Sequence, residues 1–133
     1  MSRGLVVLDT HAWIWWASDP AKLGKLARHE IDRAKKVGVP AICSLELATL
    51  AARGRITLNR PILEWLHDAL AESRVELLPL TPAVAVKAAD LPPTFPGDPA
   101  DRLIVATAII ESATLVTKDE RIRAFAGVRT IWG

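Results

Sequence analysis

The chain contains one cysteine, no tyrosine and no long apolar run. The single thiol, Cys43, cannot form a disulfide within the chain, and its apolar neighbours favour a buried, unreactive side chain. The longest strongly apolar run, residues 103–110, is less than half the length of a membrane-spanning helix. The uncharged stretch between Arg3 and Asp9 is too short for the hydrophobic region of a secretory signal. These absences predict a cytoplasmic protein without a membrane segment.

Neither sign of charge dominates the chain. Seventeen lysines and arginines against fifteen aspartates and glutamates give a formal net charge of +2, too small a surplus to identify a nucleic-acid-binding protein. The basic residues gather in two groups along the sequence: Lys22, Lys25, Arg28, Arg33, Lys35 and Lys36, and then Arg53, Arg55 and Arg60. We interpret the first group as a solvated helix face. The separation of basic residues from isolated acids also fits a polyanion lying across an acidic centre.

Short apolar segments alternate with longer segments of helical periodicity, which is typical of a parallel sheet covered by helices on both faces. We therefore predict a three-layer α/β fold with a central parallel sheet of four to five strands, formed by residues 1–133 as one domain. The predicted strands are residues 5–8, 39–43, 75–80, 114–117 and 128–131. Apolar spacing predicts helices over 23–31, 62–70, 84–91 and 103–113. The proline-rich residues 91–97 predict a loop.

Acidic residues follow several of the predicted strands. They are Asp9 after the first strand, Glu46 after the second, Asp119 after the fourth, and Asp98 and Asp101 after the proline-rich loop. Ligands of open parallel sheets bind beyond the carboxyl ends of the strands, so we expect these acids to meet at one edge. Converging like charges repel, and a divalent cation is the simplest compensation. Oxygen ligands favour Mg²⁺ or Mn²⁺, and the sequence shows neither a His/Cys pair at zinc-ligand spacing nor a glycine-rich phosphate loop.

Helix capping is the alternative explanation for the acids, because aspartate is a preferred N-cap residue. It applies to Asp9, Asp98, Asp101 and Asp119, which all precede or begin predicted helices. Glu46 differs, since Ser44 is the better cap there and a carboxylate buried among apolar neighbours requires a partner. Both explanations stay open at this point, because a capping carboxylate can also hold a ligand.

Tryptophan is unusually frequent, with five in the chain and three of them at positions 13, 15 and 16. Consecutive helical residues point about 100° apart, so these three side chains cannot all face one core. We expect two of them in the core and one at the surface. An exposed tryptophan beside apolar Ile14 suits a protein interface.

Four motifs together resemble the PIN-domain family and, within it, the VapC-type toxins of bacterial toxin–antitoxin pairs. They are LDTH at 8–11, Glu46 followed by LAARGRI at 50–56, GDPADRLIVATA at 97–108, and LVTKD at 115–119. Each motif alone is weak, but the four occur in order, at fitting spacing and over nearly the whole chain. Two positions depart from the family pattern, where Cys43 replaces a frequent serine and Gly97 a frequent histidine. Neither departure removes an acid.

The resemblance implies a Mg²⁺-dependent ribonuclease, with Mn²⁺ as a substitute cation, that forms a homodimer and is inhibited by a cognate VapB-type antitoxin. It implies that the metal-binding and catalytic acids are Asp9, Glu46, Asp101 and Asp119, and that the supporting residues are Thr10, Asp98 and Thr117. Candidates for contact with the RNA backbone are Arg53, Arg55, Arg102 and Lys118, although Arg102 has an equal claim to a structural ion pair.

Two other functions fit part of the pattern. An aspartyl-phosphate phosphatase also has a catalytic aspartate after its first strand, but it needs a second one two residues later, where this chain has His11. A non-catalytic nucleic-acid or protein-binding PIN-like module is the second alternative, and the intact acids argue against it. Incubating RNA with magnesium or with a chelator distinguishes these functions.

Overall fold

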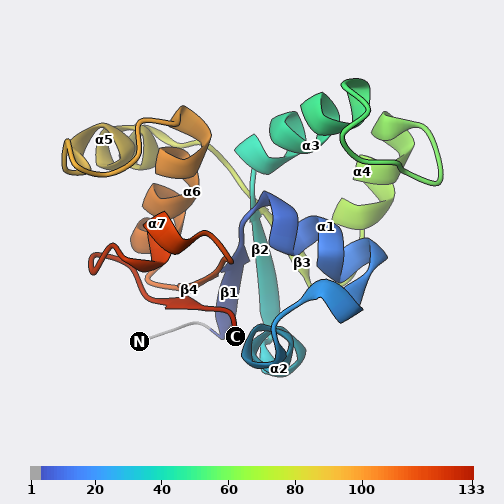
Figure 1. Ribbon diagram of the computed structural model, residues 1–133, viewed down its shortest axis with the longest axis horizontal. Coiled ribbons are helices and arrows are strands. Elements are labelled where there is room, and N and C mark those ends of the chain that lie inside the picture. Colours follow the sequence, from blue (N-terminus) through green and yellow to red (C-terminus); the bar gives the residue numbers. More distant parts are fainter. Residues whose placement is uncertain (1–3) are drawn as a thin grey trace.

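The computed structural model describes residues 4–133, in which five parallel strands form one sheet in the order β3-β2-β1-β4-β5 (Figure 1). The strands are β1 Leu5–Leu8, β2 Lys36–Pro40, β3 Val75–Leu78, β4 Thr114–Val116 and β5 Thr130–Ile131. The α-helices are α1 Thr10–Ser18, α2 Lys25–Arg33, α3 Ile42–Ala52, α4 Ile62–Leu70, α5 Pro82–Asp90, α6 Pro99–Ile110 and α7 Glu120–Arg123, with a short 3₁₀ helix at Pro20–Lys22.

The chain leaves β1 in one direction and later returns to its other side. The connections from β1 to β2 and β3 run one way across the sheet, whereas β4 and β5 lie on the opposite side of β1. Right-handed crossovers therefore place α1 to α4 on one face and α5 to α7 on the other, as Figure 1 shows. The three-layer α/β prediction is confirmed. The connections after β1 and β4 leave toward opposite faces, which opens a crevice at the carboxyl ends of these two strands.

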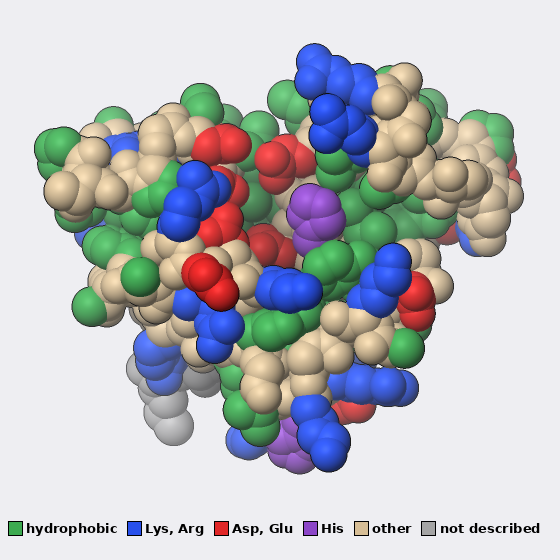
Figure 2. Space-filling model, viewed as in Figure 1, with side chains coloured by type: hydrophobic (Ala, Val, Ile, Leu, Met, Phe, Trp, Pro, Cys, Tyr) green, Lys and Arg blue, Asp and Glu red, His purple; other side chains and the backbone are tan. Residues whose placement is uncertain are grey.

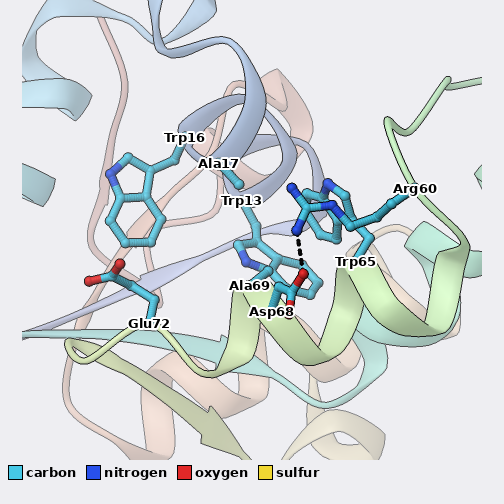
Figure 3. A pocket seen from close by; sticks show the side chains of 8 residues that line it. All are labelled: Trp13, Trp16, Ala17, Arg60, Trp65, Asp68, Ala69 and Glu72. Atoms are coloured by element: carbon cyan, nitrogen blue, oxygen red, sulfur yellow. Dashed lines mark hydrogen bonds and ion pairs between the residues drawn. The ribbon is translucent and has the colours of Figure 1, made fainter.

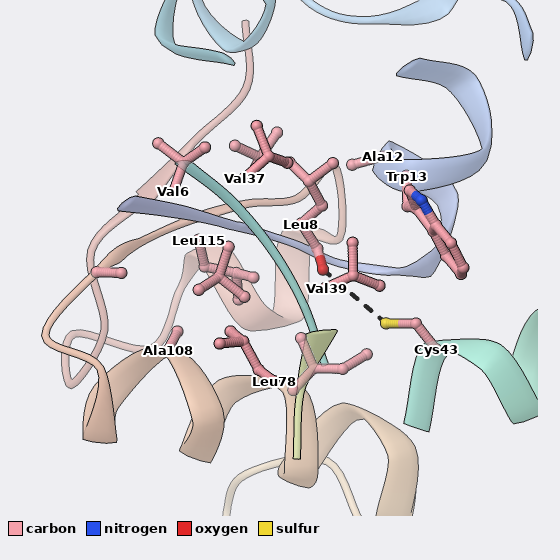
Figure 4. Packing of buried hydrophobic residues seen from close by; sticks show 14 of the residues in the cluster. Val6, Leu8, Ala12, Trp13, Val37, Val39, Cys43, Leu78, Ala108 and Leu115 are labelled. Atoms are coloured by element: carbon pink, nitrogen blue, oxygen red, sulfur yellow. Dashed lines mark hydrogen bonds between the residues drawn. The ribbon is translucent and has the colours of Figure 1, made fainter. Parts of the chain in front are cut away.

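The central strands form the core because their side chains are apolar on both faces. All four residues of β1 are buried, and Leu8 packs with Val39, Leu115 and Trp13 (Figure 4). Each such side chain contributes roughly 1.5–3 kcal/mol through burial. Cys43 is buried in the same cluster, with its Sγ 3.9 Å from the Leu8 carbonyl oxygen, and burial raises the pKa of its thiol. The predicted buried position of this cysteine is confirmed.

Several predicted boundaries are wrong. The second strand begins at Lys36 and ends at Pro40, because an exposed charged residue starts it and the apolar residues 41–43 already belong to α3 and its N-terminus. Ala41 is the N-cap of α3 and makes no side-chain cap, so the expected cap at Ser44 is wrong. The fifth strand is shortened to two residues. The helices around 62–70, 84–91 and 103–113 and the loop at 91–97 are present, with ends shifted by a few residues.

The tryptophan prediction is wrong in part. Trp13 is fully buried, but Trp15 and Trp16 are both half-buried, so one side chain rather than two belongs wholly to the core. The three side chains leave α1 toward different neighbours: Trp13 contacts Trp65 on α4, Trp15 contacts Trp132 beyond β5, and Trp16 packs beneath Arg74. Within residues 4–133, no helix combines the length and apolar character needed to cross a membrane.

Candidate active site

An open pocket of about 640 Å³ lies at the crevice between the carboxyl ends of β1 and β4. Its lining includes six carboxylates, from Asp9, Glu46, Asp98, Asp101, Asp119 and Glu120. Figure 2 shows acidic side chains gathered in a hollow on the face of the molecule turned toward the viewer, between the α6 and α3 sides. All five acids singled out in the sequence therefore line one pocket, as the strand-end argument predicted.

Asp9 lies where β1 and β4 meet. Its backbone N–H donates to the carbonyl oxygen of Val116 (3.2 Å), which ties the end of β1 to β4. Its carboxylate accepts a hydrogen bond from the N–H of Ala12 (2.9 Å) and so caps α1. Asp9 is therefore a helix cap, as the capping explanation predicted, and it also lines the pocket.

Glu46 enters the pocket from the first half of α3. It is only half-buried, and its partner comes from the neighbouring helix, since the Thr10 hydroxyl donates to Glu46 Oε1. Thr10 itself is 3% exposed, so the hydroxyl has a fixed position at the start of α1. The carboxylate that required a partner has one, and that partner is 36 residues away in sequence.

The start of α6 supplies two more acids with different surroundings. Asp98 is exposed and caps the helix by accepting from the N–H of Ala100 (2.9 Å), and Pro99 occupies the first turn. Asp101 lies in that turn but is not the cap, and its side chain is 18% exposed. Asp98 is therefore the cap, and Asp101 is not a cap but occupies the first turn, where the helix dipole favours a carboxylate.

Asp119 caps α7 and is held by an arginine that sequence reasoning did not identify. Its Oδ1 accepts from the N–H groups of Arg121 (2.8 Å) and Ile122 (3.3 Å), and the buried Thr117 hydroxyl accepts from the N–H of Asp119 (3.1 Å). The Arg121 guanidinium lies 3.3 Å from Asp119 and 3.6 Å from Asp101. Burial raises the pKa of Asp119, but the hydrogen bonds from Arg121 and Ile122 outweigh it and hold the pKa below its usual value.

Asp9 and Asp101 have pKa values above that of an ordinary aspartate. Burial raises the pKa of Asp9, and the charge of Asp119 adds to the rise. Burial also raises the pKa of Asp101 to about 6, with smaller contributions from the charges of Asp98, Asp119 and Glu46. Like charges in a partly desolvated pocket produce this pattern, and a bound cation relieves it.

The donor set of the pocket fits a hard divalent cation, because six carboxylates and the Thr10 hydroxyl supply oxygen ligands and the His11 imidazole is the one nitrogen donor beside them among the described lining residues. Among residues 4–133, however, no three His, Cys, Asp or Glu side chains stand close enough together to hold a metal ion as they are. A cation held by three of these carboxylates would therefore require them to approach one another.

The predicted RNA-binding residues fall into three places. Lys118 is exposed and lines the pocket. Arg53 and Arg55 are exposed just beyond the C-terminus of α3 and do not line it. Arg102 points away: its guanidinium donates to the carbonyls of residues 88, 91, 95 and 96, which braces the proline-rich loop. Because these carbonyls engage Arg102, we remove it from the candidates for RNA contact.

Four further pocket residues were not singled out as site residues in the sequence, and one of them is the sixth acid, Glu120 of α7. His11 and Trp15 line the wall formed by α1, and Ile104 of α6 contributes an apolar side chain. The sequence partly indicated the positions of His11 and Trp15, because His11 belongs to the LDTH motif and Trp15 follows four residues later, on the same side of a helix. The contact of Arg121 with two acids had no such signal, because it depends on how α6 and α7 pack.

A second hollow, of about 440 Å³, lies between α1 and α4 (Figure 3). We call it the tryptophan groove; it is lined by Trp13, Trp16, Ala17, Arg60, Trp65, Asp68, Ala69 and Glu72. Trp13 and Trp65 meet edge to face with their ring centroids 5.6 Å apart, and Arg60 forms an ion pair with Asp68 across the rim. The remaining basic group, Lys22 to Lys36, is exposed around α2 and the start of β2, away from both hollows.

Known proteins resemble this chain over nearly its whole length. The sequence model of the PIN domain matches residues 6–128. Ribonuclease VapC22 of Mycobacterium tuberculosis is 47% identical over 129 residues, which cover 96% of this chain and 98% of that protein. The structure of VapBC-1 from nontypeable Haemophilus influenzae has a similar fold (TM-score 0.70, 15% identity, 96% of both chains). So does VapBC2 from Rickettsia felis bound to a DNA fragment from their promoter (TM-score 0.69, 17% identity, 97% of this chain and 99% of that one). The chain belongs to the PIN-domain family.

Proposed function

We propose that this chain is a metal-dependent endoribonuclease and the toxin of a VapBC-type toxin–antitoxin pair. The observation that carries the proposal is the convergence of six carboxylates, from four separate segments, in one pocket at the crevice of the sheet. Such a concentration of like charge costs stability, so a function is the better explanation for it. The name of the relative that is 47% identical, a ribonuclease, supports the same activity.

In this proposal Asp9, Glu46, Asp101 and Asp119 hold the cation, which is Mg²⁺ with Mn²⁺ as a substitute. A bound divalent cation neutralises the acids, polarises a phosphodiester and makes an attacking water more acidic. The chain's own contribution is to position the ligands. Thr10 orients Glu46, Thr117 fixes the backbone at Asp119, and Asp98 starts the helix that carries Asp101.

The substrate in this proposal is RNA, bound along the pocket by its phosphates. Lys118 is the pocket-lining residue suited to that contact, and Arg53 and Arg55 are placed to bind a more distant phosphate past the end of α3. The products carry 5′-phosphates if water attacks in line with the departing 3′ oxygen.

The partners in this proposal are a second copy of the chain and a VapB-type antitoxin, in the cytoplasm. The two structures described above are named as VapBC pairs, and the tryptophan groove offers an apolar surface to an antitoxin segment. Trp16 is the residue to test, because it is half-buried in that groove. Replacing Trp16 by Ala should weaken antitoxin binding; unchanged affinity would place the antitoxin elsewhere.

The test of the activity is cleavage of structured RNA by the purified protein with Mg²⁺, with Mn²⁺ and with excess chelator. We expect cleavage with either cation and none with chelator. The Asp101→Asn variant, prepared in parallel, controls for a contaminating ribonuclease and should be inactive. Undiminished cleavage in chelator contradicts the metal requirement. RNA binding without cleavage under every condition favours the non-catalytic module instead.

A further inference from the structure

One wall of the acid pocket is aromatic rather than acidic. His11 and Trp15 lie one turn apart on α1, both line the pocket, and their ring centroids are 5.6 Å apart with the planes tilted by 50°. His11 is exposed. The ammonium of Lys118 lies 5.8 Å from the centroid of the Trp15 ring, so a cation is held beside the aromatic wall.

The wall is held in place from behind by the C-terminal segment. Trp15 packs against Trp132 at a centroid distance of 5.6 Å. The carbonyl oxygen of Trp132 accepts from the N–H of Ala27 (2.8 Å), and a Cβ at Gly24 would lie 2.2 Å from the same oxygen. This close docking fixes Trp132, which in turn fixes Trp15. The His11 ring is therefore exposed to solvent and rests on Trp15, which Trp132 holds in place.

The charges of the pocket show why such a wall matters for RNA. Six carboxylates line the pocket, and Lys118 is the single lysine or arginine among the lining residues that the structure describes. A polyanion gains little here from electrostatics until a cation is bound. An uncharged ring contacts the π face of an unpaired base without that penalty, and every base has such a face.

We propose that His11, supported by Trp15, stacks on an unpaired nucleobase of the RNA, while Lys118 binds the adjoining phosphate. The inference rests on the proposed ribonuclease function and goes beyond it by naming a base subsite beside the acids. The subsite selects single-stranded or looped RNA, because a base paired within a helix cannot reach the ring.

The test measures RNA binding and cleavage by His11→Ala and His11→Phe, with His29→Ala, an exposed histidine on α2, as the matched control. The binding probe is a short fluorescein-labelled single-stranded RNA, and anisotropy is recorded in an Asp101→Asn background that suppresses cleavage. Loss of one stacked base weakens binding by about tenfold, which is the expected effect of His11→Ala. In the cleavage assay KM should rise with little change in kcat. His11→Phe should retain the affinity, because it keeps a ring, and His29→Ala should behave as the parent protein.

A series of RNAs, each with one abasic nucleotide, identifies the stacked base. At one position the missing base should weaken binding to the parent protein and have no further effect on His11→Ala. If His11→Ala binds and cleaves like the parent, the base subsite is wrong while the ribonuclease function stands. If His11→Phe is as weak as His11→Ala, stacking is wrong. If the parent protein neither binds nor cleaves RNA, the proposed function fails, and the subsite with it.

Discussion

Helix α1 separates two hollows of opposite character. His11 and Trp15 face the acid pocket, and Trp13 and Trp16 face the tryptophan groove. In the groove the ring of Trp13 is fully buried against Trp65, and the rim charges include the Arg60–Asp68 ion pair. The groove thus has the apolar contacts and paired charges of a stable surface.

The acid pocket lacks that balance. Its lining holds six carboxylates, and Asp9 and Asp101 have raised pKa values because burial and neighbouring charges oppose their ionisation. Crowded carboxylates lower the stability of the folded protein, and clusters of this kind are typical of functional sites. Substitutions on the two sides of α1 should therefore affect different properties. Those in the tryptophan groove should lower the free energy of unfolding, and those in the acid pocket should lower the activity.

The largest effect should come from Asp101→Asn. Asn preserves the shape of the side chain and is a far poorer ligand of Mg²⁺, so RNA cleavage should fall by about 100-fold or more. The metal-free protein should melt at the same or a higher temperature, because one of several crowded charges is gone. Asp32→Asn, at an exposed site on α2, is the matched control and should leave cleavage unchanged. Unaltered cleavage by Asp101→Asn would refute the metal-ligand assignment.

Trp13→Ala should produce the reverse result. Removing a fully buried indole costs about 3–5 kcal/mol of the free energy of unfolding, measured by urea denaturation. The folded fraction should still bind Mg²⁺, because Trp13 does not line the acid pocket. Trp16→Ala is the comparison: it is half-buried in the same groove and should cost less. A loss of Mg²⁺ affinity in folded Trp13→Ala would show that the two hollows are coupled.

The sequence predicted those features that depend on short stretches of chain. The apolar run before Asp9 marked β1, and the end of the fourth strand marked the position of Asp119. Because ligands of parallel sheets bind beyond the carboxyl ends of the strands, the acids could be predicted to lie close together without knowledge of the strand order. The second strand was misplaced because its first residue is the exposed Lys36, whereas its apolar extension into 41–43 is helical.

Contacts between distant segments could not be predicted in the same way. Thr10 meets Glu46 only because α1 and α3 pack together, and the four carbonyls around Arg102 come from the end of α5 and the loop after it. The crevice between β1 and β4 depends on a strand order that no local pattern contains. The support of the aromatic wall could not be predicted from the sequence for the same reason, since Trp132 lies 117 residues beyond Trp15.

A pH series should sharpen the comparison with a smaller effect. The pKa of Asp101 is about 6 in the folded protein, against a usual value of 3.8. The folded state therefore binds this proton more tightly than the unfolded state, and the protein is more stable when Asp101 is protonated than when it is ionised. That favourable contribution is complete below the unfolded pKa and is lost as the pH rises through 6. In metal-free buffer, Asp101→Asn should therefore be more stable than the parent by on the order of 1 kcal/mol above neutral pH, after allowance for solvent screening. Melting curves should show this advantage shrinking as the pH falls below about 6. An advantage that stays constant over this range would contradict the shift.

The smallest effect on stability should come from Arg121→Gln, which tests whether Arg121 compensates the charge of Asp101 and Asp119 in the metal-free protein. Arg121 contacts Asp101 and Asp119 but is 65% exposed, so solvent screens both ion pairs and the melting temperature should change little. The effect of Mg²⁺ should change more. The guanidinium pairs with two acids that the proposed function assigns to the cation, so its removal eliminates an internal competitor for them. The rise in melting temperature on adding Mg²⁺ should therefore be larger in Arg121→Gln than in the parent, whereas Arg123→Gln, an exposed arginine of the same helix, should match the parent. A smaller rise in Arg121→Gln would mean that Arg121 helps to assemble the site rather than competing for it.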